Sequence, residues 1–446
     1  MSTLHDRLDD LAADAPTGSP DPDLWDRGRR YARRRRAGTA AVLAVAAVVL
    51  AVGGWRVQDL SKPDGELRPA GSTAALPDRV WEPSPWLAGT DEVGPPGRLA
   101  LVELGERRDW YGSDVEPWGI SAETGSYAFL DLPGRAEGQN RVTLSPDGRL
   151  VAYWLRGDPS GSRASGEEES VTGYALWDAT TGEVRRHLVE TEHGLSVGRL
   201  VFADAETLVA QFGHWIAGAD GPQEQHGVAD YAPLEVWDVA DLAPRASPVL
   251  ERAVGGNQID GGGHGRIWWR TEDTVVSSDV HDAAAHVRVV PLGGSAQSHV
   301  SAVDATGRRA ATIGPAMSRN VRVGEEGGTG RRVLGTERSI GVLAWLDAER
   351  LLVVRAPERR RQLRFGLSVV DPVSGESTEI TATGGSPLTS TLTGHTEVAW
   401  QLAGGPTFDA VSPGHPPDPR LVLAGLLAVL VTAACVLIRW RRRGPA

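Results

Sequence analysis

Histidine, glutamate and glycine clusters are the parts of this chain whose residue types could support metal, anion or acid–base chemistry. His281 and His286 lie five residues apart, which suits neither one helix face nor one strand face, so we interpret both as surface histidines. Residues 255–266 contain enough glycine to cradle an anion, but no strand-to-helix pattern surrounds them, which favours a flexible loop between repeats. Residues 167–169 are three glutamates, typical of a solvated hairpin tip.

Several well-known catalytic motifs are missing from the sequence. A Walker phosphate loop needs Gly-Lys-Ser/Thr, whereas the only lysine, Lys62, precedes Pro63. Neither a His-Glu-x-x-His zinc helix nor a Gly-x-Ser-x-Gly nucleophile elbow occurs. The sequence therefore predicts no catalytic residue, no metal ligand and no cofactor site, and indicates a protein that is not an enzyme. The alternative is a hydrolase or lyase with a site at a central channel, formed by acidic residues from several repeats.

The 15 tryptophans of the chain suggest carbohydrate stacking as a further possibility. Most of those in the central part occupy predicted strand positions, which favours a role in the core. Trp268 and Trp269 are the exception, because adjacent strand residues face opposite sides and one of the two is expected to be exposed.

The elements that would position these residues are short strands. Apolar runs with alternating or β-branched residues recur, separated by Gly, Asp and Pro, and no amphipathic helix of a dozen residues is evident between them. In the clearest copy, residues 142–154, Asp147-Gly148 separates two strands as in a hairpin, since glycine readily supplies the positive φ of the turn. Weaker copies lie at residues 199–210, 265–269, 302–312, 342–354 and 393–400, and a first unit lies near residues 98–103.

A second unit, a strand ending in Asp before a turn, follows the first at residues 174–183, 234–238 and 367–376. A recurrence of roughly 40 to 50 residues is typical of a β-propeller. The sequence therefore predicts an all-β domain, a seven-bladed propeller with a range of six to eight blades.

The hairpin motif carries a family resemblance. Residues 145–149, Ser-Pro-Asp-Gly-Arg, resemble the turn of TolB-like and WD40-like propellers, and Trp177-Asp178 and Trp237-Asp238 resemble the WD dipeptide. The resemblance covers about residues 76–403 and implies the fold alone. The Gly-His pair at Gly394-His395, of the kind that opens WD40 blades, is out of phase with a Trp-Asp pair, so an irregular bacterial propeller is the expected form.

Two uncharged apolar runs lie near the chain ends, at residues 37–55 and 421–438. Each is long enough to cross a hydrocarbon layer of ~30 Å as a helix. Arginines flank both runs on the side nearer the terminus, and such basic flanks stay cytoplasmic. These membrane-flanking residues are Arg33, Arg34, Arg35, Arg36, Arg439, Arg441, Arg442 and Arg443. A cleaved signal peptide and a buried core helix are the respective alternatives to the two spans.

The predicted organisation follows from these spans. Both ends are predicted to be cytoplasmic, as a tail of residues 1–36 and a basic tail of residues 439–446. Between the two spans lies an extracytoplasmic propeller, residues 80–403, joined to them by linkers at residues 56–79 and 404–420. The chain is then a two-pass protein of the cell membrane. The only cysteine, Cys435, lies in the second run, so the propeller must be stable without a disulfide.

The charge distribution restricts the partners. The net charge is −12, with +1 on residues 1–36 and +4 on residues 439–446, which leaves −17 between them. This acidic part argues against nucleic acid as a partner, because phosphate binding needs a positive surface. Membrane lipids are expected partners of the arginine clusters.

The N-terminal tail has features of a short amphipathic helix, with Leu4, Leu8 and Leu11 on one face after a capping Thr3. The tail resembles those of actinobacterial membrane-anchored proteins that accompany extracytoplasmic-function sigma factors. A disordered lipid-binding tail is the alternative. The sequence thus predicts an extracytoplasmic binding or sensing propeller that engages a protein or an envelope polymer, with a cytoplasmic sigma factor as a possible second partner.

Overall fold

The computed structural model describes residues 73–137, 142–161, 169–215, 228–229, 234–271, 273–282, 287–292, 301–314, 320–356, 366–383 and 396–442, with isolated positions before residue 34. The chain divides into two compact units, residues 60–416 and residues 1–59 with 417–446, and each is considered by itself. The first unit contains the strands. The predicted amphipathic segment at residues 3–11 and the predicted span at 37–55 lie outside the described residues, apart from Asp9.

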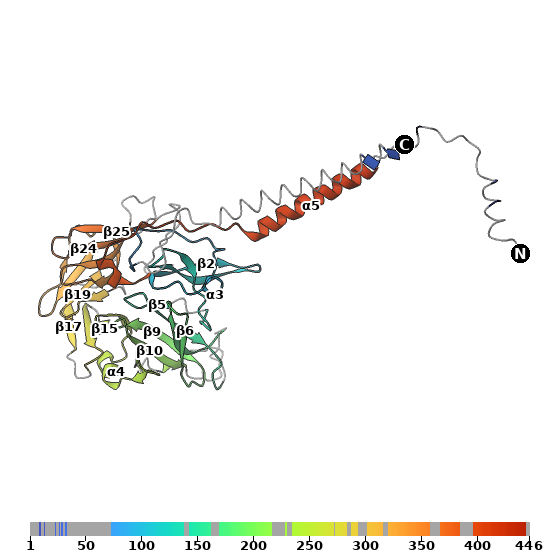
Figure 1. The fold of residues 1–446 in the computed structure, drawn as a ribbon. Helices are drawn as coiled ribbons and strands as arrows, with labels where there is room; N and C mark the ends of the chain where they lie inside the picture. The colour runs from blue at the N-terminus through green and yellow to red at the C-terminus, as the bar shows by residue number, and fades with distance from the viewer. Residues whose placement is uncertain are drawn as a thin grey trace, which may run out of the picture. The chain divides into compact units, whose positions relative to one another are not determined.

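The strands of the first unit form six antiparallel sheets, the blades of a β-propeller (Figure 1). Blade 1 comprises β26 (Glu397–Val398), β2 (Leu99–Arg108), β3 (Ser113–Ser121) and β4 (Tyr127–Phe129). Blade 2 comprises β5 (Val142–Leu144), β6 (Leu150–Arg156), β7 (Val171–Asp178) and β8 (Val184–Leu188). Blade 3 comprises β9 (Leu195–Phe202), β10 (Thr207–Trp215), β12 (Leu234–Asp238) and β13 (Arg245–Ala246), with β11 (Val228–Ala229) paired to β10.

Blade 4 comprises β14 (Ile259–Gly263), β15 (Arg266–Thr271), β16 (Thr274–Asp279) and β17 (Arg288–Pro291). Blade 5 comprises β18 (Ser301–Val303), β19 (Arg309–Ile313), β20 (Val321–Glu325) and β21 (Arg331–Arg332). Blade 6 comprises β22 (Ser339–Trp345), β23 (Leu351–Arg355), β24 (Gly366–Val370), β25 (Ser377–Thr383) and the parallel strand β1 (Arg79–Val80). The all-β propeller predicted from the sequence is therefore confirmed.

The blade number is six within the described residues, so the preferred prediction of seven is wrong. The sequence repeats near residues 98–103 and 393–400 were counted as two blades, but they belong to one. Val398 of β26 pairs with Leu101 of β2, which makes β26 the innermost strand of blade 1. At the other end of the chain, Arg79 of β1 pairs with Ala382 at the outer edge of blade 6. Both chain ends thus close the ring, which leaves fewer exposed strand edges.

The predicted Asp-Gly hairpin is confirmed between β5 and β6, where Val142 pairs with Tyr153. Gly148 has a φ of 78°, which side chains rarely adopt. A Cβ atom at this position would lie 2.0 Å from the Leu99 carbonyl oxygen, so glycine is required for contact with blade 1 as well as for the turn. The Leu99 N–H donates a hydrogen bond of 2.7 Å to the Gly148 carbonyl.

The Trp177-Asp178 pair lies at the end of β7. Trp177 is buried in a cluster shared with residues of β2 and β6. Asp178 accepts a hydrogen bond of 2.9 Å from Arg149 Nε and a second one from the Thr180 N–H. The pair therefore combines a core side chain with a carboxylate that fixes two turns.

The expected exposure of either Trp268 or Trp269 is wrong, because both faces of each blade are covered by neighbouring blades. Trp268 and Trp269 are both buried, with exposures of 3% and 2%. Trp268 packs in the cluster formed with blades 5 and 6, and Trp269 packs in the cluster formed with blade 3. Adjacent strand residues do face opposite sides here, but neither side meets solvent. Trp118, Trp154, Trp177, Trp237 and Trp345 are also buried, whereas Trp110 is 54% exposed.

Helices are few in the described residues: α3 (Thr90–Val93), α4 (Pro248–Val254), the 3₁₀ helix η1 (Trp400–Gly404) and α5 (Pro419–Arg442). The glycine-rich residues 255–266, expected as a flexible loop, form the turn after α4 and the inner strand β14. Helix α5 coincides with the second apolar run and carries Arg439, Arg441 and Arg442 at its end. Among the helices of the described part of the chain, none has the length and apolar character needed to cross a membrane.

Candidate functional site

The innermost strands of all six blades line a central cavity of about 730 Å³. Its walls come from β5, β9, β14, β18, β22 and β26, together with residues of β2, β6, β15 and η1 and of the segments next to the inner strands. A volume of this size matches those of small-molecule sites, which are ~300 to 1,000 Å³. The charged residues that line it are Glu103, Arg199, Asp260 and Glu397. The cavity therefore places three carboxyl groups and one guanidinium around one space.

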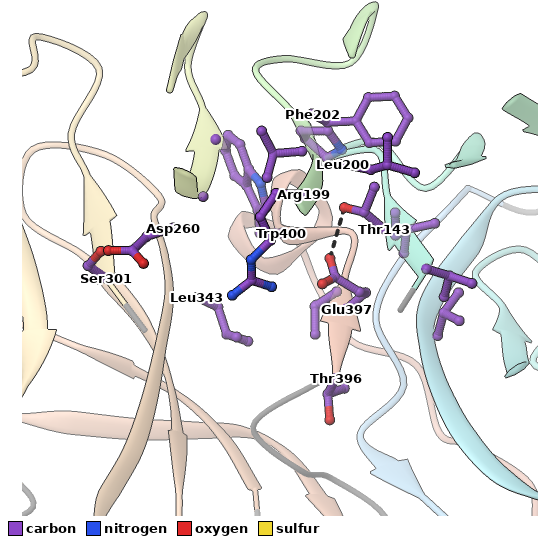
Figure 2. Close-up of a pocket in the computed structure, with 18 of the residues that line it drawn as sticks. Thr143, Arg199, Leu200, Phe202, Asp260, Ser301, Leu343, Thr396, Glu397 and Trp400 are labelled. Carbon is purple, nitrogen blue, oxygen red and sulfur yellow. Dashed lines mark hydrogen bonds between the residues drawn. The ribbon is translucent and has the colours of Figure 1, made fainter. Parts of the chain in front are cut away.

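Two of the carboxyl groups come from one pair of strands because of the ring closure. Glu397 of β26 is paired with Val102 of β2, so Glu103 is one residue further along the neighbouring strand and its side chain leaves the opposite face of the sheet. Glu103 is buried, and its Oε2 accepts a hydrogen bond from the Thr396 hydroxyl. The Thr143 hydroxyl of β5 donates to Glu397 Oε2 over 3.4 Å, as Figure 2 shows. Glu103 is thus bonded to the residue that precedes β26, and Glu397 is bonded to blade 2.

The protonation of Glu397 is shifted toward neutral pH. Burial disfavours the carboxylate and raises the pKa of Glu397 to about 7, and the nearby negative charge of Glu103 acts in the same direction. A backbone hydrogen bond at Leu144, the positive charge of Arg199 and the Thr143 hydroxyl oppose the increase. Glu397 can therefore gain or lose a proton near pH 7, which few carboxyl groups of proteins can do.

Arg199 and Asp260 complete the charged part of the cavity. Arg199 lies on β9, and in Figure 2 its guanidinium is directed into the cavity toward the side of Glu397. Asp260 lies on β14, and its Oδ2 is 3.4 Å from Nε of Arg270. This ion pair is largely buried, because the two side chains expose 8% and 12% of their surface. Asp260 therefore has a positively charged partner within its own blade, and the positive charge of Arg199 acts on Glu397.

Aromatic side chains form the apolar part of the wall, and Trp400 is the most accessible of them. The four aromatic lining residues are Trp154, Phe202, Trp268 and Trp400. Trp400 lies on η1 and its ring centroid is 4.6 Å from that of His264, at an interplanar angle of 49°. His264 has a φ of 56° and its Nε2 is 2.8 Å from the Trp345 carbonyl oxygen. The Trp400 ring is thus supported by a histidine from blade 4.

The residues singled out from the sequence lie elsewhere. His281 Nε2 forms an ion pair of 2.7 Å with Asp204 of blade 3, and His286 lies outside the described residues. Glu169 contacts Arg156 at 3.1 Å, while residues 167 and 168 are outside the described part. No group of three or more metal-ligating side chains occurs among the residues that the structure describes. Of the membrane-flanking arginines, Arg34, Arg35, Arg36 and Arg443 are not described.

The charged cavity residues were missed in the sequence, although each carries a weak signal. Glu103 directly follows four apolar residues of β2, and Glu397 interrupts the inner strand β26. A carboxylate at such a position is unusual, because inner propeller strands are buried. Without the pairing of β26 with β2, however, the two glutamates are 294 positions apart in the sequence and nothing connects them.

Comparisons with known proteins identify no family for this chain. No family model and no curated protein matches the sequence. Solved structures that resemble the chain include a putative 6-phosphogluconolactonase from Bacteroides uniformis, with 11% identity and a TM-score of 0.31 over 63% of this chain and 95% of that one. A nidogen/laminin complex matches with 9% identity and a TM-score of 0.32, over 64% and 97%. An acylaminoacyl peptidase matches with 12% identity and a TM-score of 0.35, over 63% and 44%.

Proposed function

We propose that the propeller is a binding module whose ligand enters the central cavity and presents an organic cation to its carboxyl groups, Glu397 above all. The observation that carries this proposal is the presence of three carboxyl groups and one guanidinium, Arg199, in the lining of the cavity. The carboxyl groups outnumber the positive charge, so a cation is attracted more than an anion. The cation is either a free molecule or part of an envelope polymer, which is the partner predicted from the sequence.

The rest of the wall suits the same ligand. Thr143, Ser301 and Thr396 bring hydroxyl groups into the lining, which can bind hydroxyls of the ligand. Trp400 offers an aromatic face, and such faces attract ammonium groups within ~6 Å of the ring centroid. A small alkylammonium compound with a hydroxyl group therefore matches the residues of the cavity.

Choline is a suitable probe, because its charge does not depend on pH, and 3,3-dimethylbutan-1-ol is its neutral isostere. Calorimetric titration of the full chain should detect choline binding and weaker or no binding of the isostere. The Glu397→Gln variant should lose binding about tenfold or more, whereas Glu349→Gln, at an exposed turn, should bind as the wild type does. Equal affinities of choline and its isostere would exclude the proposed cation site.

The pH dependence gives a second test of the same proposal. A cation binds the ionised form of Glu397, and protonation competes with it. Because the pKa of the free site is about 7, affinity should rise about tenfold between pH 6 and pH 8 and should be flat in Glu397→Gln. An affinity that falls over this range would contradict a role for the Glu397 carboxylate.

Hydrolysis is a second candidate function, favoured by one observation. A carboxyl with a pKa of about 7 in a cavity that holds further carboxyl groups fits the general acid of a glycoside hydrolase or a lyase. Incubation with nitrophenyl glycosides tests this function, with release of nitrophenol as the readout. Activity that disappears in Glu397→Gln and persists in Glu349→Gln would favour the enzyme, and no release from any glycoside would favour the binding module.

Attachment to a membrane is part of the proposal and is supported by the sequence. Residues 421–438 carry no charge and precede Arg439, and large apolar side chains of α5 such as Leu421 and Leu430 are 71% and 61% exposed. Flotation of the full chain with phosphatidylcholine vesicles tests attachment. Protease treatment of intact and lysed cells tests the proposed exterior location of residues 80–403, because only an exterior propeller is digested in both.

A cytoplasmic partner of residues 1–36, such as a sigma factor, is the last part of the proposal. It is supported by the leucine pattern Leu4, Leu8 and Leu11. Co-purification from membranes with and without residues 1–22 tests it. Identical partner sets would exclude a signalling role of the tail.

A further inference from the structure

The β2–β3 hairpin of blade 1 extends beyond its own sheet. The first five residues of β2 and the last five of β3 are buried, whereas the other ends of both strands are half-buried or exposed. The strands remain paired to their ends, since Arg108 pairs with Ser113. The outer half of the hairpin is therefore a regular two-stranded arm that leaves the core of blade 1 (Figure 1).

Two aromatic residues occupy the tip of this arm. Trp110 is 54% exposed and Tyr111 is 98% exposed. Their backbone is held in place by Asp109, whose Oδ1 accepts hydrogen bonds of 2.6 Å from the N–H groups of Tyr111 and Gly112. The tip thus presents large side chains with polar ends on a fixed turn, and exposed aromatic groups of this kind mark contact surfaces.

The charges next to the tip are compensated within the protein. Arg108 Nε donates a hydrogen bond of 2.8 Å to Glu106, and Arg107 forms an ion pair with Asp131. The Arg107 guanidinium also lies 5.4 Å from the centroid of the Phe129 ring. Neither arginine is therefore arranged as part of a basic patch for anionic groups, and the aromatic side chains are the main feature that the tip offers to a partner.

The end of the arm near its tip is bonded to the segment beside which the chain leaves the propeller unit. The Arg108 N–H donates a hydrogen bond of 2.8 Å to the Pro85 carbonyl, and the neighbouring Ser84 hydroxyl donates over 3.4 Å to the Pro416 carbonyl. Pro416 is the last residue of the propeller unit, and the apolar helix α5 begins at Pro419. Only residues 417 and 418 therefore separate the first residue of α5 from Pro416, which is bonded to Ser84 beside the segment that contacts the arm.

We propose that Trp110 and Tyr111 insert into the interfacial layer of the lipid bilayer to which the chain is attached, and so fix the propeller against the membrane surface. Trp and Tyr are the residues enriched in this layer, because their rings are apolar and their N–H and O–H groups remain hydrated. The inference rests on the membrane attachment proposed above. Contact with the lipid is apolar, and it does not depend on anionic head groups.

A fluorescent label next to the tip tests the insertion in the full chain. Gly112→Cys in a Cys435→Ser background provides one thiol for the dye NBD, and a Cβ at Gly112 meets no atom within 4 Å. Leu242→Cys in the same background is the control. Leu242 is fully exposed between the third and fourth strands of blade 3, and this turn lies at the opposite end of a blade from a turn between second and third strands. The labelled chains are placed in phosphatidylcholine vesicles that contain 5-doxyl phosphatidylcholine.

Insertion predicts at least twofold quenching of the label at position 112 and none at position 242. The quenching should be lost when Trp110 and Tyr111 are replaced by serine, and it should be unchanged when phosphatidylglycerol is added. If the chain floats with the vesicles but position 112 is no more quenched than position 242, the insertion is refuted while membrane attachment stands. A chain that does not float refutes both, and quenching that requires phosphatidylglycerol refutes the apolar contact.

Discussion

The Thr143 hydroxyl donates a hydrogen bond of 3.4 Å to Oε2 of Glu397, a residue 254 positions later in the sequence. The bond joins the inner strand of blade 2 to the inner strand of blade 1, which the C-terminal part of the propeller supplies. The same closure pairs Glu397 with Val102, the residue before Glu103. Strand β26 therefore closes the ring and also supplies Glu397 to the cavity, so changes to β26 affect both.

Glu397 should make the stability of the fold depend on pH. Its pKa is about 7 in the folded chain and close to 4.5 when unfolded, so the folded chain retains a proton that the unfolded chain has lost between these values. The free energy of unfolding should then fall as pH rises through this window, by up to ~3 kcal/mol. Urea unfolding at several pH values should show a flatter profile for Glu397→Gln. Parallel profiles of the two proteins would contradict the raised pKa.

Asp178 should have the opposite pH dependence. Burial disfavours its charge, but hydrogen bonds from Thr180 and Arg149 outweigh burial and lower the pKa of Asp178. Its contribution is therefore complete above the unfolded pKa and is lost as pH falls through the lower folded value. At pH 7, Asp178→Asn should cost about 1 to 3 kcal/mol in urea unfolding. Asp238→Asn, in the equivalent Trp-Asp pair, should cost less, because Asp238 bonds the Ala240 N–H and no arginine bond to it is found among the described residues.

Gly148→Ala should destabilise the protein through two effects. The φ of 78° strains any side chain, and the added Cβ would meet the Leu99 carbonyl oxygen of the neighbouring blade. Gly256→Ala is the matched control, because Gly256 has a φ of 82° but no atom within 4 Å of the added Cβ. Backbone strain alone, as in Gly256→Ala, should lower the free energy of unfolding by about 1 kcal/mol. Gly148→Ala should lower it clearly more, as measured by thermal unfolding. Equal losses in the two variants would mean that the blades separate easily here.

Removal of a buried tryptophan should be far more harmful than removal of the exposed one. Trp269→Ala should lower the free energy of unfolding by about 3 to 5 kcal/mol, because the side chain fills the space between blades 3 and 4. Trp110→Ala should change it by less than about 0.5 kcal/mol. Chemical unfolding of both variants in the same detergent checks the difference. A loss below about 1 kcal/mol for Trp269→Ala would contradict the burial of both adjacent tryptophans.

The fold could be predicted from the sequence where the signal is local. The hairpin of residues 142–154 and the Trp-Asp strands depend on neighbours in the chain, so alternation and turn residues suffice to find them. The blade number could not be obtained in this way, because the pairing of Val398 with Leu101 joins distant segments that each look like a separate repeat. The burial of both Trp268 and Trp269 could not be predicted for a related reason. Strand alternation shows that the two side chains lie on opposite faces of the sheet, but it does not show which elements cover each face.

The candidate site was beyond a motif search for the same physical reason. Glu397 and Glu103 form no recognisable spacing, and their proximity depends on the closed ring. The residues with recognisable spacing, such as His281, are explained by a local ion pair with Asp204. A sequence can still indicate such a site once the inner strands are known. The indication is a charged residue in a strand that lines the centre of the propeller.

The parallel bridge between Pro77 and Phe408 has a mechanical consequence. Residues 77 and 408 belong to the segments that enter and leave the propeller, and they are paired side by side. Tension applied between these two segments would therefore act on this pairing before it reached any of blades 2 to 5. The backbone pairing of Pro77 with Phe408 would break first, and the pairings of β1 and β26 would follow while the central blades kept their hydrogen bonds. A protein held at its two ends could then lengthen under tension by opening the ring, and the ring could close again when the tension is removed.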